Sequence, residues 1–186
     1  DHPRNPRSFY GITKLAAEQY VDVFGREGMR TTVFRMSNVY GPGQNLDNQK
    51  QGMVSIYMSY LIRDEPILVM GSLDRYRDLV YIDDVVDAWC AALSNPQSYG
   101  KVYNLGGGNR VTVRELICAE IAAFGHDPDL YEVNVGGTTH GDIFGVQVDT
   151  SLIRRELGWH PNTSVRDGIQ RMAEEVRWMG QEAAIG

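Results

Sequence analysis

Helical and strand patterns alternate along this chain, and that alternation constrains its fold more than any other feature. Apolar residues recur near the 3.6-residue period of a helix in several stretches, and short runs rich in β-branched residues separate those stretches. Such alternation is typical of an α/β fold. The expected helices cover residues 8–24, 53–63, 83–93, 112–124, 151–157 and 165–179, and the expected strands cover residues 31–36, 67–70, 78–82, 101–105, 131–135 and 145–148.

Three of the expected helices begin with residues that commonly cap helices. Asp83 precedes the third helix, and Ser164 precedes the last one. Thr112 is followed three residues later by Glu115, which is the spacing of a capping box. We therefore predict that Asp83, Thr112 and Ser164 each cap the first turn of a helix.

The composition argues against several functional classes. The 186 residues carry a net charge of −6, which gives no general electrostatic reason to bind nucleic acid or an anionic membrane. No apolar run approaches the roughly 18 residues that a membrane span needs. Cys90 and Cys118 fall in apolar helical patterns, so we expect reduced core thiols, which fit a cytoplasmic protein. No Cys/His set has the spacing of a metal site, so no metal is expected.

Tyr10 and Lys14 form the first candidate site. They are four residues apart in the first expected helix, so their Cβ atoms lie about 5 to 6 Å apart on one face. An ammonium group at that distance can favour the ionised form of a phenol and make it a proton-transfer group. A half-buried ring beside a lysine whose stem packs along the surface would leave the same pattern. The pair alone therefore leaves both interpretations open.

Two further candidates lie near the ends of strands. Asn38 follows the strand expected at residues 31–36, at an edge where open α/β folds bind ligands, although it can also serve the turn. Arg77 precedes a short strand in a charged stretch, where its guanidinium would suit a phosphate and a surface ion pair is the alternative. A glycine-rich loop holds His140 and Asp142, which could meet a ligand hydroxyl or belong to a plain turn.

A dinucleotide-binding glycine motif is missing from these residues. No Gly-x-Gly-x-x-Gly sequence follows an expected strand. The glycines at positions 106–108 do follow a strand, but they lack a spaced third glycine. We therefore expect a tight connection at the edge of the sheet, and not a pyrophosphate-binding turn.

Five segments, taken in order, resemble the extended short-chain dehydrogenase/reductases that act on nucleotide sugars, the NAD-dependent epimerase/dehydratase group. They are residues 8–18, 35–43, 77–85, 103–107 and 149–161. The resemblance implies an α/β fold made of the C-terminal part of a Rossmann-type doubly wound sheet and a small α/β substrate-binding domain.

The resemblance also implies where these domains lie. Residues 1–50 would end the Rossmann-type domain with the catalytic helix, a strand and a binding loop. Residues 51–186 would form mainly the nucleotide-sugar domain, while residues 83–105 would return to the Rossmann-type sheet.

Each matching residue acquires an expected role from the family. Tyr10 would exchange a proton with a sugar hydroxyl while hydride passes to NAD, which is expected ahead of NADP, and Lys14 would hold the nicotinamide ribose. The backbone at Ser37 would approach the nicotinamide. Arg77 would bind the diphosphate. The implied substrate-binding residues are Asn38, Met53, Val54, Arg77, Asn104 and Asp142.

Two departures from the family pattern shape the expectation. The later loop has His140 before Gly141 and Asp142, where the family usually has Arg-Pro-Gly-Asp, so a second phosphate-binding arginine is absent. The chain also begins nine residues before Tyr10, whereas the family's dinucleotide motif precedes that helix. We therefore expect a C-terminal portion that is inactive alone, binds NAD negligibly, and needs a complementing N-terminal half or a second copy of the chain.

The expected reaction is epimerisation of a nucleotide-activated sugar through a transient keto intermediate, as in UDP-glucose 4-epimerases. Two alternatives stay open: a nucleotide-sugar 4,6-dehydratase, and a non-catalytic module that binds a nucleotide sugar or a partner protein. The complete enzyme is expected to be a cytoplasmic homodimer that binds neither nucleic acid nor membrane.

Overall fold

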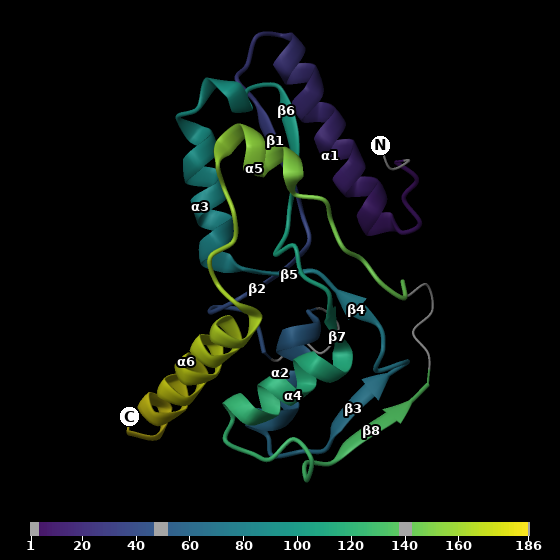
Figure 1. Cartoon of the computed structure of the whole chain (residues 1–186), viewed down its shortest axis with the longest axis vertical. Coiled ribbons are helices and arrows are strands. Elements are labelled where there is room, and N and C mark those ends of the chain that lie inside the picture. Colours follow the sequence, from purple (N-terminus) through teal and green to yellow (C-terminus); the bar gives the residue numbers. More distant parts are fainter. Residues whose placement is uncertain (1–3, 47–51, 138–142, 186) are drawn as a thin grey trace.

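The computed structural model describes residues 4–46, 52–137 and 143–185, and helices alternate with short strands along them (Figure 1). The helices are α1 (Phe9–Arg26), α2 (Met53–Ile62), α3 (Ile82–Leu93), α4 (Val113–Ala123), α5 (Ser151–Leu157) and α6 (Val165–Ile185), with a 3₁₀ turn η1 (Pro96–Ser98). The strands are β1 (Thr32–Met36), β2 (Asn38–Tyr40), β3 (Ile67–Met70), β4 (Tyr76–Arg77), β5 (Leu79–Tyr81), β6 (Lys101–Leu105), β7 (Val111–Thr112) and β8 (Val133–Gly136). All six expected helices are confirmed.

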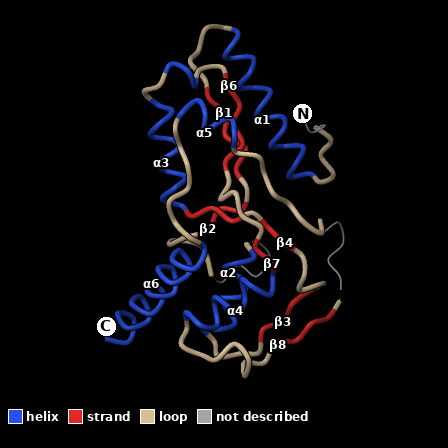
Figure 2. The backbone as a smooth tube through the Cα atoms, viewed as in Figure 1, coloured by secondary structure: helices blue, strands red, loops and turns tan. Residues whose placement is uncertain are grey.

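The strands associate in pairs. β1 pairs with β6, β2 with β5, and β3 with β8, each in parallel, while β4 and β7 pair antiparallel. Figure 2 shows the strands as short red stretches of the backbone tube. The strand expected at residues 145–148 is wrong, because only Gly145 forms a bridge there, to Tyr76.

The first part of the molecule, which we call the β1–β6 region, comprises α1, β1, α3, β6 and α5. Neighbouring residues of β1 face opposite sides of the strand pair. The ring of Phe34 lies 5.5 Å from that of Trp89 on α3, whereas Arg35 reaches Glu18 on α1. Tyr103 of β6 donates a hydrogen bond to Glu156 of α5 at 2.8 Å. The pair β1–β6 therefore has α1 on one side and α3 and α5 on the other, as Figure 1 shows.

The second part, which we call the α2–α4 region, comprises α2, β3, α4, β8 and α6. It contains the larger hydrophobic cluster, in which Met58 of α2, Leu116 of α4, Met172 of α6 and Ile67 of β3 are all buried. A capping box at Thr112 and Glu115 begins α4, as predicted, and Ser164 caps the first turn of α6 by accepting the Asp167 N–H. This region therefore has a core of its own.

Two expectations about helix surfaces are wrong. Asp83 does not cap α3: Tyr81 holds the N-cap position without a side-chain cap, and Asp83 lies in the first turn. Cys90 and Cys118 are free thiols, as expected, but both are exposed and neither is in the core. Among the described residues, no helix combines the length and the apolar character that crossing a membrane requires.

Candidate functional site

Tyr10 and Lys14 lie side by side on the surface of α1. Ser8 begins this helix by accepting a hydrogen bond from the Gly11 N–H at 3.0 Å. The Lys14 Nζ lies 5.1 Å from the centre of the Tyr10 ring, so the two side chains share one face as the sequence predicted. Tyr10 is 65% exposed, which leaves the phenol open to a ligand.

The first turn of α1 lies level with the end of β1. A Cβ added at Gly25 would lie 2.9 Å from the Thr31 Oγ1, and Glu18 bonds to Arg35, so α1 runs antiparallel to β1. Seven residues of helix advance about 10.5 Å, and three residues of strand advance about 10 Å. Going back seven residues from Glu18 and forward three from Arg35 brings Gly11 level with Asn38. The first turn of α1, which contains Tyr10, therefore lies level with the segment between β1 and β2.

Backbone hydrogen bonds fix the residues at the end of β1. The Ser37 N–H donates to the Leu105 carbonyl at 2.8 Å, and the Asn38 N–H donates to the Asp78 carbonyl at 3.1 Å. The Ser37 Oγ is buried and has no hydrogen-bond partner among the described residues. The exposed Asn38 side chain is therefore presented at a fixed point, next to a hydroxyl that can still accept or donate.

A small pocket brings three predicted substrate residues together. Asn38 comes from β2, whereas Met53 and Val54 come from the start of α2. The pocket has a volume of about 20 Å³, enough for roughly one water molecule. It is lined by Asn38, Val39, Tyr40, Gln44, Gly52, Met53, Val54 and Leu79.

Arg77 lies at the end of β4 in a partly buried, positively charged place. Its Nη1 donates to the Tyr76 carbonyl at 2.8 Å and to the Phe144 carbonyl at 3.5 Å. Burial lowers the pKa of the Arg77 guanidinium, and the charge of Arg75 lowers it further. Burial and a neighbouring cation both disfavour the charged guanidinium, and the approach of an anionic ligand would favour it.

The structure gives different answers for the last two predicted residues. Asn104 on β6 pairs in register with Arg35, and its side-chain amide donates to the Asp149 carbonyl at 3.2 Å. That bond holds the chain before α5 against the strand pair. Asp142, like His140, lies outside the described residues.

Asp78 is a residue that sequence reasoning missed. Its side chain is fully buried and accepts hydrogen bonds from the Gly108 and Val148 N–H groups, both at 3.1 Å. Burial raises the pKa of Asp78, and the hydrogen bonds from these and neighbouring backbone groups oppose that rise. The signal in the sequence was an acidic residue directly before the apolar strand β5, where an unpaired carboxylate would be costly.

The glycine turn after β6 fits tightly against β5. A Cβ added at Gly107 would lie 2.0 Å from the Leu79 carbonyl oxygen, and one at Gly106 would lie 2.9 Å from an Asp78 carboxylate oxygen. Contacts that close exclude any side chain at either position. The turn is therefore the tight connection that the sequence predicted.

The comparisons with known proteins agree with this arrangement. The family model described as "NAD dependent epimerase/dehydratase family" matches residues 1–106, a span that includes α1, β1, β2 and Arg77. The chain belongs to the NAD-dependent epimerase/dehydratase family. This confirms the identification made from the sequence motifs, and it confirms the expected Rossmann-type α/β fold.

Solved and curated members of the epimerase/dehydratase family resemble most of the chain. A UDP-glucose 4-epimerase from Thermotoga maritima, solved with UDP-glucose, is 33% identical with a TM-score of 0.86, over 94% of this chain and 55% of that one. MoeE5, solved with UDP-glucose and NAD, is 30% identical with a TM-score of 0.84, over 96% and 58%. The dTDP-4-dehydro-6-deoxyglucose reductase of Escherichia coli is 30% identical, over 92% of this chain and 53% of its own length. The chain thus spans about half the length of these relatives.

The residues present fit one end of NAD. Tyr10 and Lys14 offer an exposed phenol and ammonium beside the strand end, and the Ser37 hydroxyl is buried without a partner among the described residues. These groups suit the polar nicotinamide ribose of the cofactor. They do not include a glycine-rich helix start for its pyrophosphate.

Proposed function

We propose that this chain supplies the acid/base helix and the nucleotide-sugar half of an NAD-dependent 4-epimerase that acts on a UDP-hexose. One observation carries the proposal: Tyr10 and Lys14 share an exposed face of α1. The first turn of that helix lies level with the segment that leads from β1 to Asn38, by the rise of the helix and the strand from the Glu18–Arg35 bond. The similar UDP-glucose 4-epimerase from Thermotoga maritima supports the choice of sugar and nucleotide.

In the proposed reaction, Tyr10 takes the proton of the sugar 4-hydroxyl. It returns a proton to that oxygen after the keto sugar has rotated to present its opposite face. Lys14 stabilises the ionised phenol and holds the nicotinamide ribose through its three N–H donors. Bound NAD supplies the group that accepts and returns the hydride. Asn38 holds the sugar, so that the carbon that reacts stays beside the phenol.

The remaining predicted residues hold the nucleotide in this proposal. Arg77, with the charge of Arg75 close by, binds the diphosphate. Met53 and Val54 contact the nucleotide from the start of α2, beside the pocket at Asn38. Asn104 supports the sugar pocket by holding the segment before α5, and Asp142 is proposed to meet the nucleotide.

The wider organisation is also a proposal. We place the end of the Rossmann-type domain at residues 1–50, the nucleotide-sugar domain mainly at residues 51–186, and the return to the Rossmann-type sheet at residues 83–105. Most of the NAD site would lie in the half of the relatives' length that this chain does not span, and this chain would be inactive without it.

The assembly of the complete enzyme is proposed to be a homodimer in the cytoplasm. Large apolar side chains on α1 are exposed, among them Phe9 at 91% and Val23 at 51%, and they would suit a contact with another chain. The two free, exposed thiols Cys90 and Cys118 suit a reducing compartment.

The test is the interconversion of UDP-glucose and UDP-galactose by the complete enzyme, followed by NMR. Tyr10→Phe should lower kcat by about 10²- to 10⁴-fold, which is the usual contribution of a general acid/base, and should change KM little. Tyr20→Phe is the matched control, because it removes a second exposed phenol from the same helix.

Other outcomes would contradict parts of the proposal. An unchanged kcat for Tyr10→Phe would exclude the acid/base role. A 4-keto-6-deoxy product would identify a 4,6-dehydratase, and binding of UDP-sugar without any conversion would identify a non-catalytic module.

A further inference from the structure

The catalytic helix is weakly embedded in the molecule. None of the side chains of α1 is buried, and Tyr10, Phe9 and Ile12 in its first turn are all more than half exposed. A helix held by so little apolar packing can shift or rotate on its support. Some other contact must fix where Tyr10 lies.

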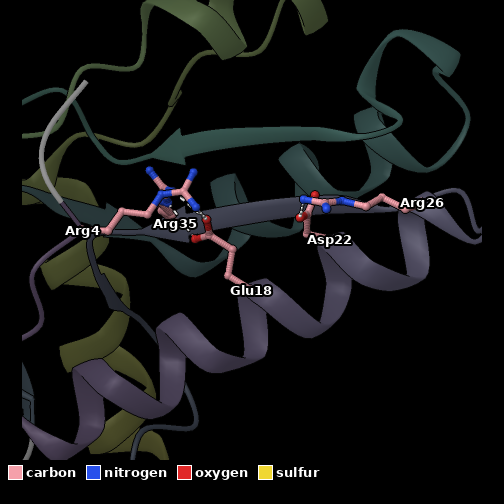
Figure 3. A network of polar contacts seen from close by, with 5 residues as sticks. All are labelled: Arg4, Glu18, Asp22, Arg26 and Arg35. Atoms are coloured by element: carbon pink, nitrogen blue, oxygen red, sulfur yellow. Dashed lines mark hydrogen bonds and ion pairs between the residues drawn. The ribbon is translucent and has the colours of Figure 1, made fainter.

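Glu18 and Arg35 make that contact. Arg35 donates to both carboxylate oxygens of Glu18, from Nε at 2.8 Å and from Nη2 at 2.6 Å. Arg4 adds a second cationic partner at 3.3 Å. The Glu18 side chain is only 12% exposed, whereas the Arg35 side chain is 40% exposed. Figure 3 shows the Arg35 guanidinium meeting the Glu18 carboxylate with two hydrogen bonds. The Arg35 bond holds the Glu18 pKa below its usual range, although burial opposes this.

The two partners belong to the two parts of the proposed site. Glu18 is one turn beyond Lys14 and two turns beyond Tyr10, on the same side of α1. Arg35 on β1 comes just before Ser37 and Asn38, and it pairs in register with Asn104 of β6. The bond therefore joins the acid/base helix directly to the strands that end in the sugar-binding residues.

We infer that the Arg35–Glu18 pair is a positioning device that sets the height and rotation of α1, and so places Tyr10 over the sugar held at Asn38. This inference rests on the proposed function. Both residues act through Tyr10, and neither touches the substrate.

The geometry explains why the two parallel hydrogen bonds of the Arg35 guanidinium matter more than its charge. Tyr10 lies eight residues from Glu18, or about 12 Å along the axis. A tilt of roughly 10° at Glu18 would move Tyr10 by about 2 Å, and a displacement of about 1 Å can cost 10²-fold in rate. Two parallel bonds resist such a tilt, whereas a single ammonium contact leaves it free.

Replacing Arg35 by lysine removes the two parallel hydrogen bonds and keeps the positive charge. In the complete enzyme, Arg35→Lys should lower kcat for the UDP-hexose about 10- to 100-fold, with KM changed less than about two-fold because Asn38 and Arg77 stay in place. Glu18→Gln should have a similar effect, and the double variant should be no worse than either single one. In a Tyr10→Phe background, Arg35→Lys should lower the residual rate no further, since no phenol remains to be positioned.

Asp22 and Arg26 provide the matched control. They form an ion pair at 2.5 Å within the same helix, and both are exposed (Figure 3). This pair joins two residues of α1 and does not link the helix to a strand. Asp22→Asn should therefore leave kcat unchanged. An unchanged kcat for Arg35→Lys, a loss confined to KM, or an equal loss in the Tyr10→Phe background would each overturn the inference.

Amide hydrogen exchange separates this inference from the proposed function. Arg35→Lys should speed exchange in α1, while α4 stays as protected as before. If the unmodified enzyme converts no UDP-hexose, the proposed function fails, and exchange alone then decides whether the pair fixes α1. Unchanged exchange in α1 would overturn the inference in that case.

Discussion

The β1–β6 region and the α2–α4 region each have a buried apolar cluster, but they differ in how their first helices, α1 and α2, are held in place. In α2, six of the ten residues are buried, whereas α1 buries none of its eighteen. Apolar packing thus defines the α2–α4 region, while polar contacts such as Arg35–Glu18 define the position of α1. The difference teaches that packing and the proposed chemistry are divided between two helices. Met53 and Val54, which are proposed to bind the nucleotide, lie on the well-packed α2, whereas the proposed acid/base pair lies on the exposed α1.

The largest expected effect tests whether apolar packing holds α4 more strongly than α1. Leu116 is fully buried in α4, so Leu116→Ala should lower the free energy of unfolding by about 2 to 5 kcal/mol. Ile12→Ala on α1 removes a similar side chain that is 51% exposed, and should change it by less than about 0.5 kcal/mol. Urea unfolding measures both. Equal losses would show that α1 is as well packed as α4.

A second prediction sharpens the description of the α2–α4 core. Glu120 is fully buried on α4, and neither of its carboxylate oxygens has a partner among the described residues. Burial raises the pKa of Glu120 well above its usual 4.5. Above pH 4.5 the unfolded chain therefore loses a proton that the folded protein keeps, so stability falls as pH rises toward the folded pKa.

Replacing this carboxyl should remove that loss. The difference in unfolding free energy between Glu120→Leu and the unmodified protein should grow as pH rises from 5 to 8. It should grow by up to about 1.4 kcal/mol for each unit of pH, as long as the pH stays below the pKa of Glu120 in the folded protein. Urea unfolding at several pH values measures the gain. The exposed Glu174→Gln should show no such trend, and a gain that does not vary with pH would contradict the explanation.

The smallest expected effect compares the same cap in both regions. Thr112 caps α4 and Ser8 caps α1, each through its side-chain oxygen. Thr112→Ala should cost about 1 kcal/mol of global stability. Ser8→Ala should instead speed amide exchange in the first turn of α1 and leave the urea midpoint unchanged, because α1 contributes no buried side chain. A matching shift of the midpoint would contradict the comparison.

Most of the fold could be predicted from periodicity, but short strands could not. Helices such as α2 and α4 extend over several turns and show a clear period. By contrast, β2 has three residues and β7 has two, so their pairing with β5 and β4 depends on partners far away in the sequence. The strand predicted at residues 145–148 was wrong for a related reason: whether a short segment forms a strand depends on a distant partner, and only Gly145 finds one, in Tyr76.

The thiols show why burial is harder to predict than a helix. The buried side of α4 carries Leu116, Ile117, Glu120 and Ile121, and Cys118 falls between these positions, on the open side. Residue type alone assigned Cys118 to the core and gave no reason to expect Glu120 there. The rotation of α4 about its axis decides which of the two side chains is buried, and packing against α2 and α6 sets that rotation.

The candidate site was predicted in part. The spacing of Tyr10 and Lys14 fixed their shared face, because helix geometry is local. The meeting of Asn38 with Met53 and Val54 was expected only through the family resemblance, because it needs two elements to fold together. The role of Asp78 could not be predicted, because its partners Gly108 and Val148 are 30 and 70 residues away.

Buried Asp78 links three segments of the chain. Its side chain accepts hydrogen bonds from the glycine turn and from the segment before α5, and its backbone carbonyl accepts one from the first residue of β2. A hinge between the two regions at this point would have to break all of these bonds at once. The backbone around Asp78, which leads from Arg77 into β5, is therefore tied to three segments that are far apart in the sequence.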